Sequence, residues 1–296
     1  MCRAALVIMA AGMASRYGGN KQIDGMGPNG EILMEYSIRD AIRAGFTKIV
    51  FIIKPEMEPV MQKICGNKFE GKAEICYAYQ DFSSIPAEYT IPADRVKPFG
   101  TVHAVMCAAQ CVTEPFAVLN ADDYYGVESF AQMHAFLTGH GSDSCAAMMG
   151  YRLKNTVSRH GAVTRAICQV ENGKLTAARE LKKIVMCDNG DVRDFTDPYK
   201  PETLDPESPV SMNFWGFCPK VFDLMQEAFA GFLQKIPEGD IKAEYLLPVF
   251  VDQMLREGKL QVDVLETDAA WFGVTYKEDK PRVAAALKEL HDKGIY

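Results

Sequence analysis

The chain has 296 residues, of which 48% are hydrophobic and 24% charged, and its formal net charge at pH 7 is −7. This mix is typical of globular proteins and excludes intrinsic disorder as a description of the whole chain. The acidic balance argues against broad contact with a nucleic-acid backbone, which needs a basic face, but leaves room for a local phosphate pocket.

The first half of the sequence alternates expected strands with expected helices. Short apolar runs predict buried strands at 4–11, 48–53, 73–79 and 115–119, and amphipathic stretches predict helices at 33–44, 56–65 and 101–111. Residues 81–100 hold three prolines and little periodicity, which indicates a loop. The alternation predicts an α/β protein with a mostly parallel sheet and helices on both faces.

The second half has a different pattern, with turn signals between short strands. Strands are expected at 144–151, 161–171, 174–181, 210–217 and 260–265, and helices at 221–232, 243–257 and 280–293. The turn signals are Asn172-Gly173 and 188–190, and 194–209 is expected to be an exposed loop. No linker divides the chain, so we expect a single domain over 1–296.

Cysteine spacing and the N-terminal apolar run bear on the cellular compartment. The nine cysteines include no C-x-x-C pair, so we expect neither a zinc site nor a disulfide framework, and free thiols suit a reducing cytosol. Gly12, Ser15 and Arg16 follow the first apolar run without a cleavage-site pattern, so the run is interpreted as a strand rather than a signal peptide. No run approaches the roughly 18 apolar residues of a membrane span. The protein is expected to be soluble and cytoplasmic.

A first polar cluster follows the first strand, at the strand end where ligands of open α/β sheets bind. It extends over 10–21, and its small residues let backbone N–H groups approach a phosphate while Arg16 and Lys21 supply positive charge. The spacing matches neither G-x-G-x-x-G nor G-x-x-x-x-G-K-[ST]. A tight turn with solvated charges is therefore an alternative interpretation.

A second polar cluster, 120–126, follows the fourth expected strand. Asp122 and Asp123 at a strand end suit Mg²⁺, which takes one or two carboxylates together with phosphate oxygens. The alternative is that an aspartate caps a helix. Together the two clusters indicate that the loop with Arg16 and the acidic strand end with Asp122 converge on one triphosphate, hence on a nucleotide.

The opening LVIMAAGMASRYGGNKQ resembles the L-A-A-G-x-[GA]-[ST]-R signature of the nucleotidyltransferase (nucleoside-diphosphate-sugar pyrophosphorylase) superfamily. Later motifs follow in that family's order: Gln80, Gly100–Val105, Asn120–Asp122, Gly161, Glu180, Asn213 and Lys242–Tyr245. The resemblance covers nearly the whole chain and implies a Rossmann-like, GT-A-like mixed sheet with a smaller β-rich acceptor-binding part. It also implies an NTP-binding half at roughly 1–140 and an acceptor-binding half at 141–296.

The activity implied by the resemblance is a Mg²⁺-dependent nucleotidyl transfer. A sugar 1-phosphate attacks the α-phosphate of an NTP, with UTP or dTTP favoured, and pyrophosphate leaves. The implied catalytic residues are Arg16, Lys21 and Asp122, with Asp122 binding the metal. The implied nucleotide contacts are Ala10, Ala11, Gly12, Met13, Gln80, Gly100, Thr101 and Asn120. The implied acceptor contacts are Gly161, Glu180, Lys182, Asn213 and Glu244.

Several of these residues also have plainer interpretations. The alternative for Glu180 is an exposed strand charge, and Glu244 is equally explained as a carboxylate on a helix surface. The family usually has a second metal ligand near the C-terminal end, where this chain offers Gly273 or Thr275. The alternatives are that Thr275 ligates through its hydroxyl, that Asp268 serves instead, or that Asp122 acts with water and nucleotide oxygens alone.

Two other functions compete with the sugar-phosphate reaction. A phosphocholine cytidylyltransferase-like enzyme would need an aromatic cage, for which Trp215, Tyr245 and Trp271 are candidates. A catalytically weak, nucleotide-sugar-binding regulatory protein would explain the missing second metal ligand. A metal-dependent glycosyltransferase is disfavoured by the Arg/Lys loop. In each case the expected partners are small molecules rather than nucleic acid or membrane, and the family resemblance allows a homo-oligomer.

Overall fold

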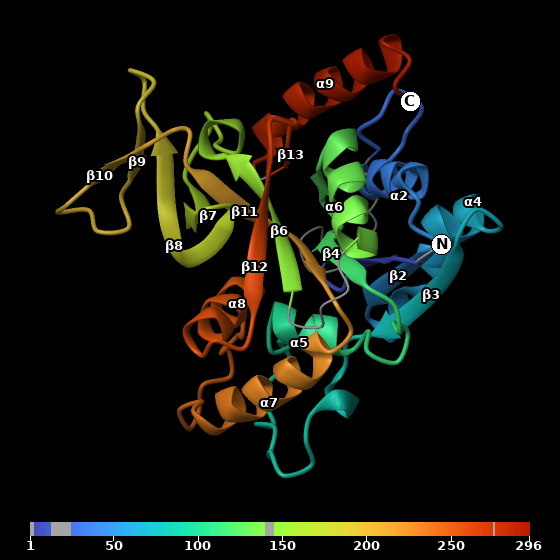
Figure 1. Ribbon diagram of the computed structural model, residues 1–296, viewed down its shortest axis with the longest axis vertical. Coiled ribbons are helices and arrows are strands. Elements are labelled where there is room, and N and C mark those ends of the chain that lie inside the picture. The colour runs from blue at the N-terminus through green and yellow to red at the C-terminus, as the bar shows by residue number, and fades with distance from the viewer. Residues whose placement is uncertain (1–2, 13–24, 140–144, 275) are drawn as a thin grey trace.

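The computed structural model describes residues 3–12, 25–139, 145–274 and 276–296, which form a large mixed sheet with helices on both faces (Figure 1). The strands are β1 (Ala5–Met9), β2 (Lys48–Ile53), β3 (Glu74–Tyr79), β4 (Phe116–Asn120), β5 (Asp123–Tyr124), β6 (Cys145–Arg152), β7 (Val163–Glu171), β8 (Lys174–Met186), β9 (Val192–Asp194), β10 (Glu202–Leu204), β11 (Pro209–Phe217), β12 (Gln261–Thr267) and β13 (Phe272–Gly273). The helices are α2 (Leu33–Ala44), α3 (Glu58–Met61), α4 (Asn67–Phe69), α5 (Thr101–Met106), α6 (Val127–Gly139), α7 (Val221–Gln234), α8 (Leu247–Arg256) and α9 (Lys280–Asp292).

The first half of the chain forms the parallel part of the sheet, in the order β4-β1-β2-β3. Alternate residues of β1 enter two different cores. Leu6 and Ile8 belong to the core that contains α2 and α6, whereas Ala5 and Val7 belong to the core that contains α5, α7 and α8. Burial on both faces explains why this strand is continuously apolar, and the predicted alternation of strands and helices is confirmed here.

The second half is mainly antiparallel, so the expectation of a mostly parallel sheet is wrong beyond β4. Strand β11 pairs antiparallel with β4, β6 and β7, and only β12 runs parallel to its neighbour β6 within this described half. The turn Asn172-Gly173 has φ of 51° and 74°, as two-residue hairpins require, and joins β7 to β8. Because the connection is so short, the two strands can only lie antiparallel.

One helix was not predicted, and two expected elements differ from the structure in kind. Helix α6 was not predicted, although Phe130, Met133 and Leu137 recur at helical spacing and are buried. The stretch 56–65 is divided between a 3-10 turn, α3 and a π turn. The loop at 194–209 contains the short strand β10, which pairs with β9. None of the helices in the described ranges is both long and apolar enough to cross a bilayer.

The expected helix at 243–257 begins later, at Leu247. Its first residues are extended because the backbone of Tyr245 pairs with another loop: its N–H donates to the Phe99 carbonyl at 2.8 Å, and its carbonyl accepts from the Val102 N–H at 3.1 Å. These long-range hydrogen bonds take the groups that a helix would use.

The C-terminus is anchored on α2. Tyr296 donates its hydroxyl to Asp40 Oδ2 at 2.6 Å, and Arg43 donates to the Ile295 carbonyl at 2.8 Å. Asp40 is only 1% exposed, and burial raises the pKa of its carboxyl to about 7. The fold therefore keeps a carboxyl in a place that disfavours its charge.

Replacing Asp40 by Asn should remove a pH dependence of stability. Between about pH 4 and 7 the folded protein holds a proton on Asp40 that the unfolded chain releases, so wild-type stability falls as pH rises through this window. Relative to the variant, the wild-type unfolding free energy should drop by a few kcal/mol, at about 1.4 kcal/mol per pKa unit. Urea denaturation at pH 5 and pH 8 measures this change, and Asp292→Asn, at an exposed aspartate, is the control. The same change in unfolding free energy between the two pH values in wild type and in Asp40→Asn would contradict the prediction.

Candidate active site

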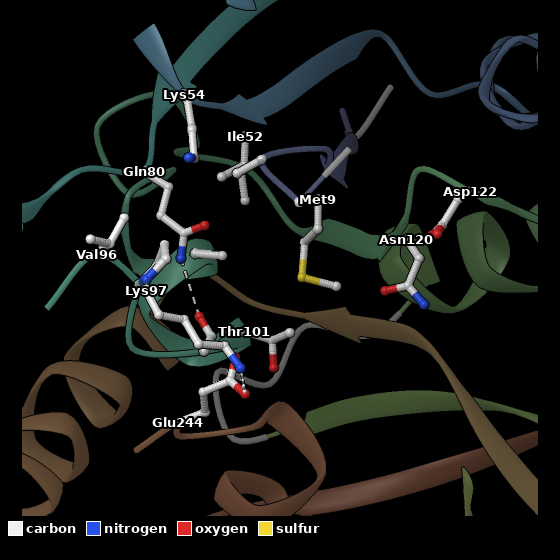
Figure 2. A pocket seen from close by; sticks show the side chains of 15 residues that line it. Met9, Ile52, Lys54, Gln80, Val96, Lys97, Thr101, Asn120, Asp122 and Glu244 are labelled. Carbon is white, nitrogen blue, oxygen red and sulfur yellow. Dashed lines mark hydrogen bonds and ion pairs between the residues drawn. The ribbon is translucent and has the colours of Figure 1, made fainter. Parts of the chain in front are cut away.

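A cavity of about 670 Å³ opens at the carboxyl ends of β1, β2, β3 and β4 (Figure 2). We call it the main cavity. It is lined by Met9, Ala11, Gly12, Ile52, Lys54, Gln80, Val96, Lys97, Pro98, Gly100, Thr101, Ala104, Asn120, Asp122 and Glu244.

The parallel register explains how the two polar clusters meet. Met9 pairs with Asn120, so the segments that follow β1 and β4 leave the sheet at the same edge, and Gly12 and Asp122 line one cavity. Ala10 is fully buried, and its N–H donates to the Ile52 carbonyl at 2.8 Å. The predicted residues Met13, Arg16 and Lys21 lie outside the described residues.

Gln80 and Gly100 form one wall of the main cavity. The amide nitrogen of Gln80 donates to the Gly100 carbonyl at 3.2 Å, and Figure 2 shows the amide oxygen turned away from this bond. The side chain is 8% exposed and therefore held in one orientation. In that orientation the wall presents a hydrogen-bond acceptor.

Gly100 occupies a position that other residues cannot take. Its φ is 95°, and a Cβ there would lie 2.6 Å from the carbonyl oxygen and 2.8 Å from the nitrogen of Tyr245. Thr101, next along the chain, accepts a hydrogen bond at its hydroxyl from the Leu247 N–H at 2.8 Å. Thr101 thus fastens the cavity wall to the start of α8, and Gly100 lets this wall pack closely on the Tyr245 backbone.

Arg95, which sequence analysis missed, fixes the loop in front of this wall. Its guanidinium donates to the carbonyls of Lys97, Pro98 and Ala243 at 2.9, 3.2 and 2.6 Å, and lies 3.5 Å from the centre of the Phe99 ring. These partners lie up to 148 residues away along the chain, so no local sequence pattern predicts that Arg95 holds this loop.

Glu244 lies at the mouth of the main cavity rather than with the other predicted acceptor contacts. Its carboxylate pairs with Lys97 Nζ at 2.7 Å, and both side chains are partly exposed (Figure 2). An exposed pair of this kind adds little stability. The reason for the different placement is the extended backbone at Tyr245, which carries Glu244 toward the loop of Lys97.

A second cavity of about 260 Å³, which we call the side cavity, shares Asn120 and Asp122 with the main one. Its lining residues are Asn120, Asp122, Asp123, Thr164, Arg165, Ala166, Glu180, Ser211, Met212, Asn213, Pro248 and Trp271. The structure therefore brings together two of the predicted acceptor contacts, Glu180 and Asn213, next to Asp122.

Two other predicted acceptor contacts lie elsewhere. A Cβ at Gly161 would lie 2.6 Å from the Tyr276 ring, so this glycine permits close packing. Lys182 is exposed on β8 and does not belong to the described residues that line the side cavity. The register of β7 and β8 shifts between the Val163 and Arg165 pairs, and this irregularity breaks the alternation that would place Lys182 beside Glu180.

Asn213 owes its position to an irregularity in β11. The register with β6 shifts between Ser211 and Trp215, and Asn213 has φ of 60°. Asparagine tolerates this left-handed conformation better than other side chains. The bulge therefore explains how a polar residue of an apolar strand comes to line the side cavity.

The two carboxylates at the acidic strand end, Asp122 and Asp123, differ in their exposure to solvent. Asp123 is buried, and its Oδ2 accepts from Asn120 Nδ2 at 2.9 Å and from the Tyr125 hydroxyl at 3.2 Å. Burial, together with the neighbouring charge of Asp122, raises the pKa of the Asp123 carboxyl. Asp122 is partly exposed where the two cavities meet.

This donor set fits Mg²⁺, which binds through one or two carboxylates and completes its shell with phosphate oxygens and water. Within the described ranges, no cluster of three or more His, Cys, Asp or Glu side chains could hold a metal alone. Asp268 is not among the described lining residues; its side chain is 91% exposed and pairs with Arg152 at 3.6 Å. Thr275 lies outside the described residues, and a Cβ at Gly273 would lie 2.8 Å from Asp123 Oδ1.

Three cationic residues of the cavities, Lys54, Lys97 and Arg165, were not predicted from the sequence. Lys54 lines the main cavity, and its place directly after the strand 48–53 was an available signal. Arg165 lines the side cavity from β7, where it shares the buried face with Val163. A charged residue at an inward position of a strand is itself a signal of function.

Comparison with known protein families gives one match. The family model for nucleotidyl transferases matches residues 7–279. No curated protein sequence gives a significant match.

Solved structures with a similar fold share little sequence. An inositol-1-phosphate CTP transferase from T. maritima has a TM-score of 0.64 at 11% identity over 97% of both chains. A putative glucose-1-phosphate thymidylyltransferase from Bacillus anthracis has a TM-score of 0.60 at 15% identity, over 97% of this chain and 96% of that one. A UDP-glucose pyrophosphorylase complexed with UDP-glucose has a TM-score of 0.58 at 15% identity, over 99% of this chain and 100% of that one. On the strength of the family match over most of its length, the chain belongs to the nucleotidyl transferase family.

Proposed function

We propose that this nucleotidyltransferase joins an NTP, with UTP or dTTP favoured, to a sugar 1-phosphate and releases pyrophosphate in a Mg²⁺-dependent reaction. The observation that carries the proposal is that the main and side cavities share Asn120 and Asp122. A nucleotide in the main cavity and a phosphorylated acceptor in the side cavity would therefore meet at Asp122.

The reaction needs alignment of two phosphates and neutralisation of their charge. Backbone groups of Ala11 and Gly12 are assigned to the triphosphate, and Arg16 and Lys21 to the charge on the departing pyrophosphate and on the α-phosphate. Asp122 would hold Mg²⁺, which supplies a template and a Lewis acid when bound. Asn120 is held beside it by its hydrogen bond to Asp123.

We assign the two halves of the domain on the same basis. Apart from Glu244, the described residues of the main cavity fall within 9–122, in the proposed NTP-binding half 1–140. The side cavity takes most of its lining from 164–271, in the proposed acceptor-binding half 141–296. Its hydroxyl, amide and carboxylate groups, from Thr164, Asn213 and Glu180, suit an acceptor rich in hydroxyl groups.

A phosphocholine acceptor has less support. Of the three aromatic residues considered for a cage, Trp215 is fully buried and Tyr245 packs in the same core. Trp271 lines the side cavity, but the Arg165 guanidinium lies 5.0 Å from its ring centre. A quaternary ammonium would meet this cation rather than an open aromatic face.

Gln80 is proposed to read the base. With its amide N–H₂ bonded to Gly100, its carbonyl oxygen is the group offered to a pyrimidine N–H. Gln80→Ala should reduce the kcat/KM ratio between the preferred and the other NTPs by about 10-fold, the value of one hydrogen bond. Gln169→Ala, an exposed glutamine on β7, is the control. An unaltered NTP preference in Gln80→Ala would remove this residue from base recognition.

A pyrophosphate-release screen tests the proposed reaction. ATP, CTP, GTP, UTP and dTTP are each combined with sugar 1-phosphates and with phosphocholine, with and without Mg²⁺. We expect release with UTP or dTTP and a sugar 1-phosphate. Release only with CTP and phosphocholine would replace the proposal by the cytidylyltransferase alternative, and no release with any pair would favour a regulatory binding protein.

A further inference from the structure

We propose that Arg165 binds the phosphate of the acceptor in the side cavity. This inference rests on the proposed function and adds a residue to it. The side cavity is lined by three carboxylates, Asp122, Asp123 and Glu180, and by Arg165 as the single cation among its described lining residues. A phosphate dianion entering this cavity needs a positive partner, and among the described lining residues Arg165 is placed to supply it.

The guanidinium of Arg165 is fixed by backbone carbonyls. Its Nε and one terminal nitrogen donate to the Thr156 carbonyl, the former at 3.1 Å, and the other terminal nitrogen donates to the Thr164 carbonyl at 2.7 Å. A guanidinium has five N–H donors, so two remain, one on each terminal nitrogen. Such a pair of N–H donors suits bidentate binding of a phosphate.

Arg165 is only 9% exposed, and its guanidinium donates no hydrogen bond to a carboxylate among the described residues. The buried Asp123 acts on this charge through space, but its Oδ2 already accepts hydrogen bonds from Asn120 and Tyr125. Its hydrogen-bond partners are neutral carbonyls, which satisfy donors without cancelling charge. Buried charges are normally paired because their desolvation is costly. An anionic ligand in the side cavity would give the Arg165 guanidinium a hydrogen-bonded anionic partner.

The location of Arg165 also suits the reaction. It lines the same small cavity as Asp122, and Asp122 also lines the main cavity. A phosphate held on Arg165 would thus lie beside the place where we assign the α-phosphate of the NTP. Arg165 would position the attacking phosphate, a role distinct from that of Asp122.

Kinetics of Arg165→Met and Arg165→Lys test the proposal. We expect Arg165→Met to raise KM for the acceptor by about 30-fold, as loss of charge-assisted hydrogen bonds implies, while KM for the NTP changes less than about threefold. Arg165→Lys keeps the charge but loses the bidentate geometry, so its KM for the acceptor should lie between those of wild type and Arg165→Met. Arg152→Met is the matched control, because Arg152 pairs with Glu266 and Asp268 and does not line the side cavity.

A binding measurement separates this inference from the proposed reaction. Inorganic phosphate and a sugar 1-phosphate are titrated calorimetrically into the full chain without NTP. Weaker binding of both to Arg165→Met, with Arg152→Met unchanged, supports the inference even if the pyrophosphate screen is negative. Equal binding by wild type and Arg165→Met would overturn it and leave Arg165 a structural link to Thr156. If Arg165→Met does not fold, the same titration is made with Arg165→Lys. Unchanged phosphate binding in Arg165→Lys would overturn the assignment of bidentate phosphate binding to Arg165.

Discussion

Replacing Asp122 by Asn is expected to lower kcat by about 1,000-fold, because loss of the metal-binding carboxylate removes several kcal/mol of charge stabilisation in the transition state. The side chain keeps its size, and Asp122 is partly exposed, so the fold should persist. Pyrophosphate release measured against Mg²⁺ concentration gives both the residual rate and the metal requirement.

Asp268→Asn is the control for this prediction, because Asp268 is an exposed carboxylate paired with Arg152. It should leave the rate and the Mg²⁺ dependence unchanged. A near-normal rate in Asp122→Asn would remove Asp122 from the metal role. Loss of activity in Asp268→Asn would instead make that residue the second ligand that the family resemblance implies.

Gly100→Ala is expected to lower the unfolding free energy by about 3 kcal/mol or more. The φ of 95° is strained for any residue with a side chain, and the new Cβ would meet the Tyr245 backbone at 2.6 Å. Backbone cannot move aside as a flexible side chain can. Because the Gly100 carbonyl also accepts from Gln80, the displacement should weaken NTP binding as well.

Gly231→Ala provides the control for this effect. Gly231 lies within α7, and a Cβ there would meet no atom within 4 Å. Alanine at a helical position without a clash should stabilise the protein by about 0.5–1 kcal/mol. Urea denaturation of both variants measures the difference. If Gly100→Ala proved as stable as Gly231→Ala, the close packing of Gly100 on Tyr245 would be wrong.

The sequence predicted the parallel half of the fold well, for a physical reason. Strands buried on both faces, such as β1 and β2, are continuously apolar, and the prediction of a strand at 48–53 matches β2. The same parallel arrangement places the strand ends together, so the convergence of the Gly12 loop and Asp122 could be expected.

The residues that the sequence did not reveal depend on contacts between distant segments. Arg95 bonds to Ala243, and Arg165 faces Trp271, across 148 and 106 residues of chain. The backbone pairing of Tyr245 with Phe99 likewise moved Glu244 to the main cavity. Local periodicity carries no information about such partners, and the irregular register around Lys182 also follows from packing between strands.

The central claim is that nucleotide and acceptor phosphate meet at Asp122, and a crystal structure of the ternary complex tests it most directly. The complex would contain Mg²⁺, a non-hydrolysable UTP or dTTP analogue and glucose 1-phosphate. We predict the base against Gln80 and Gly100, the metal on Asp122 and the sugar phosphate in the side cavity. A nucleotide bound outside the main cavity, or a sugar phosphate bound away from Asp122, would contradict the claim.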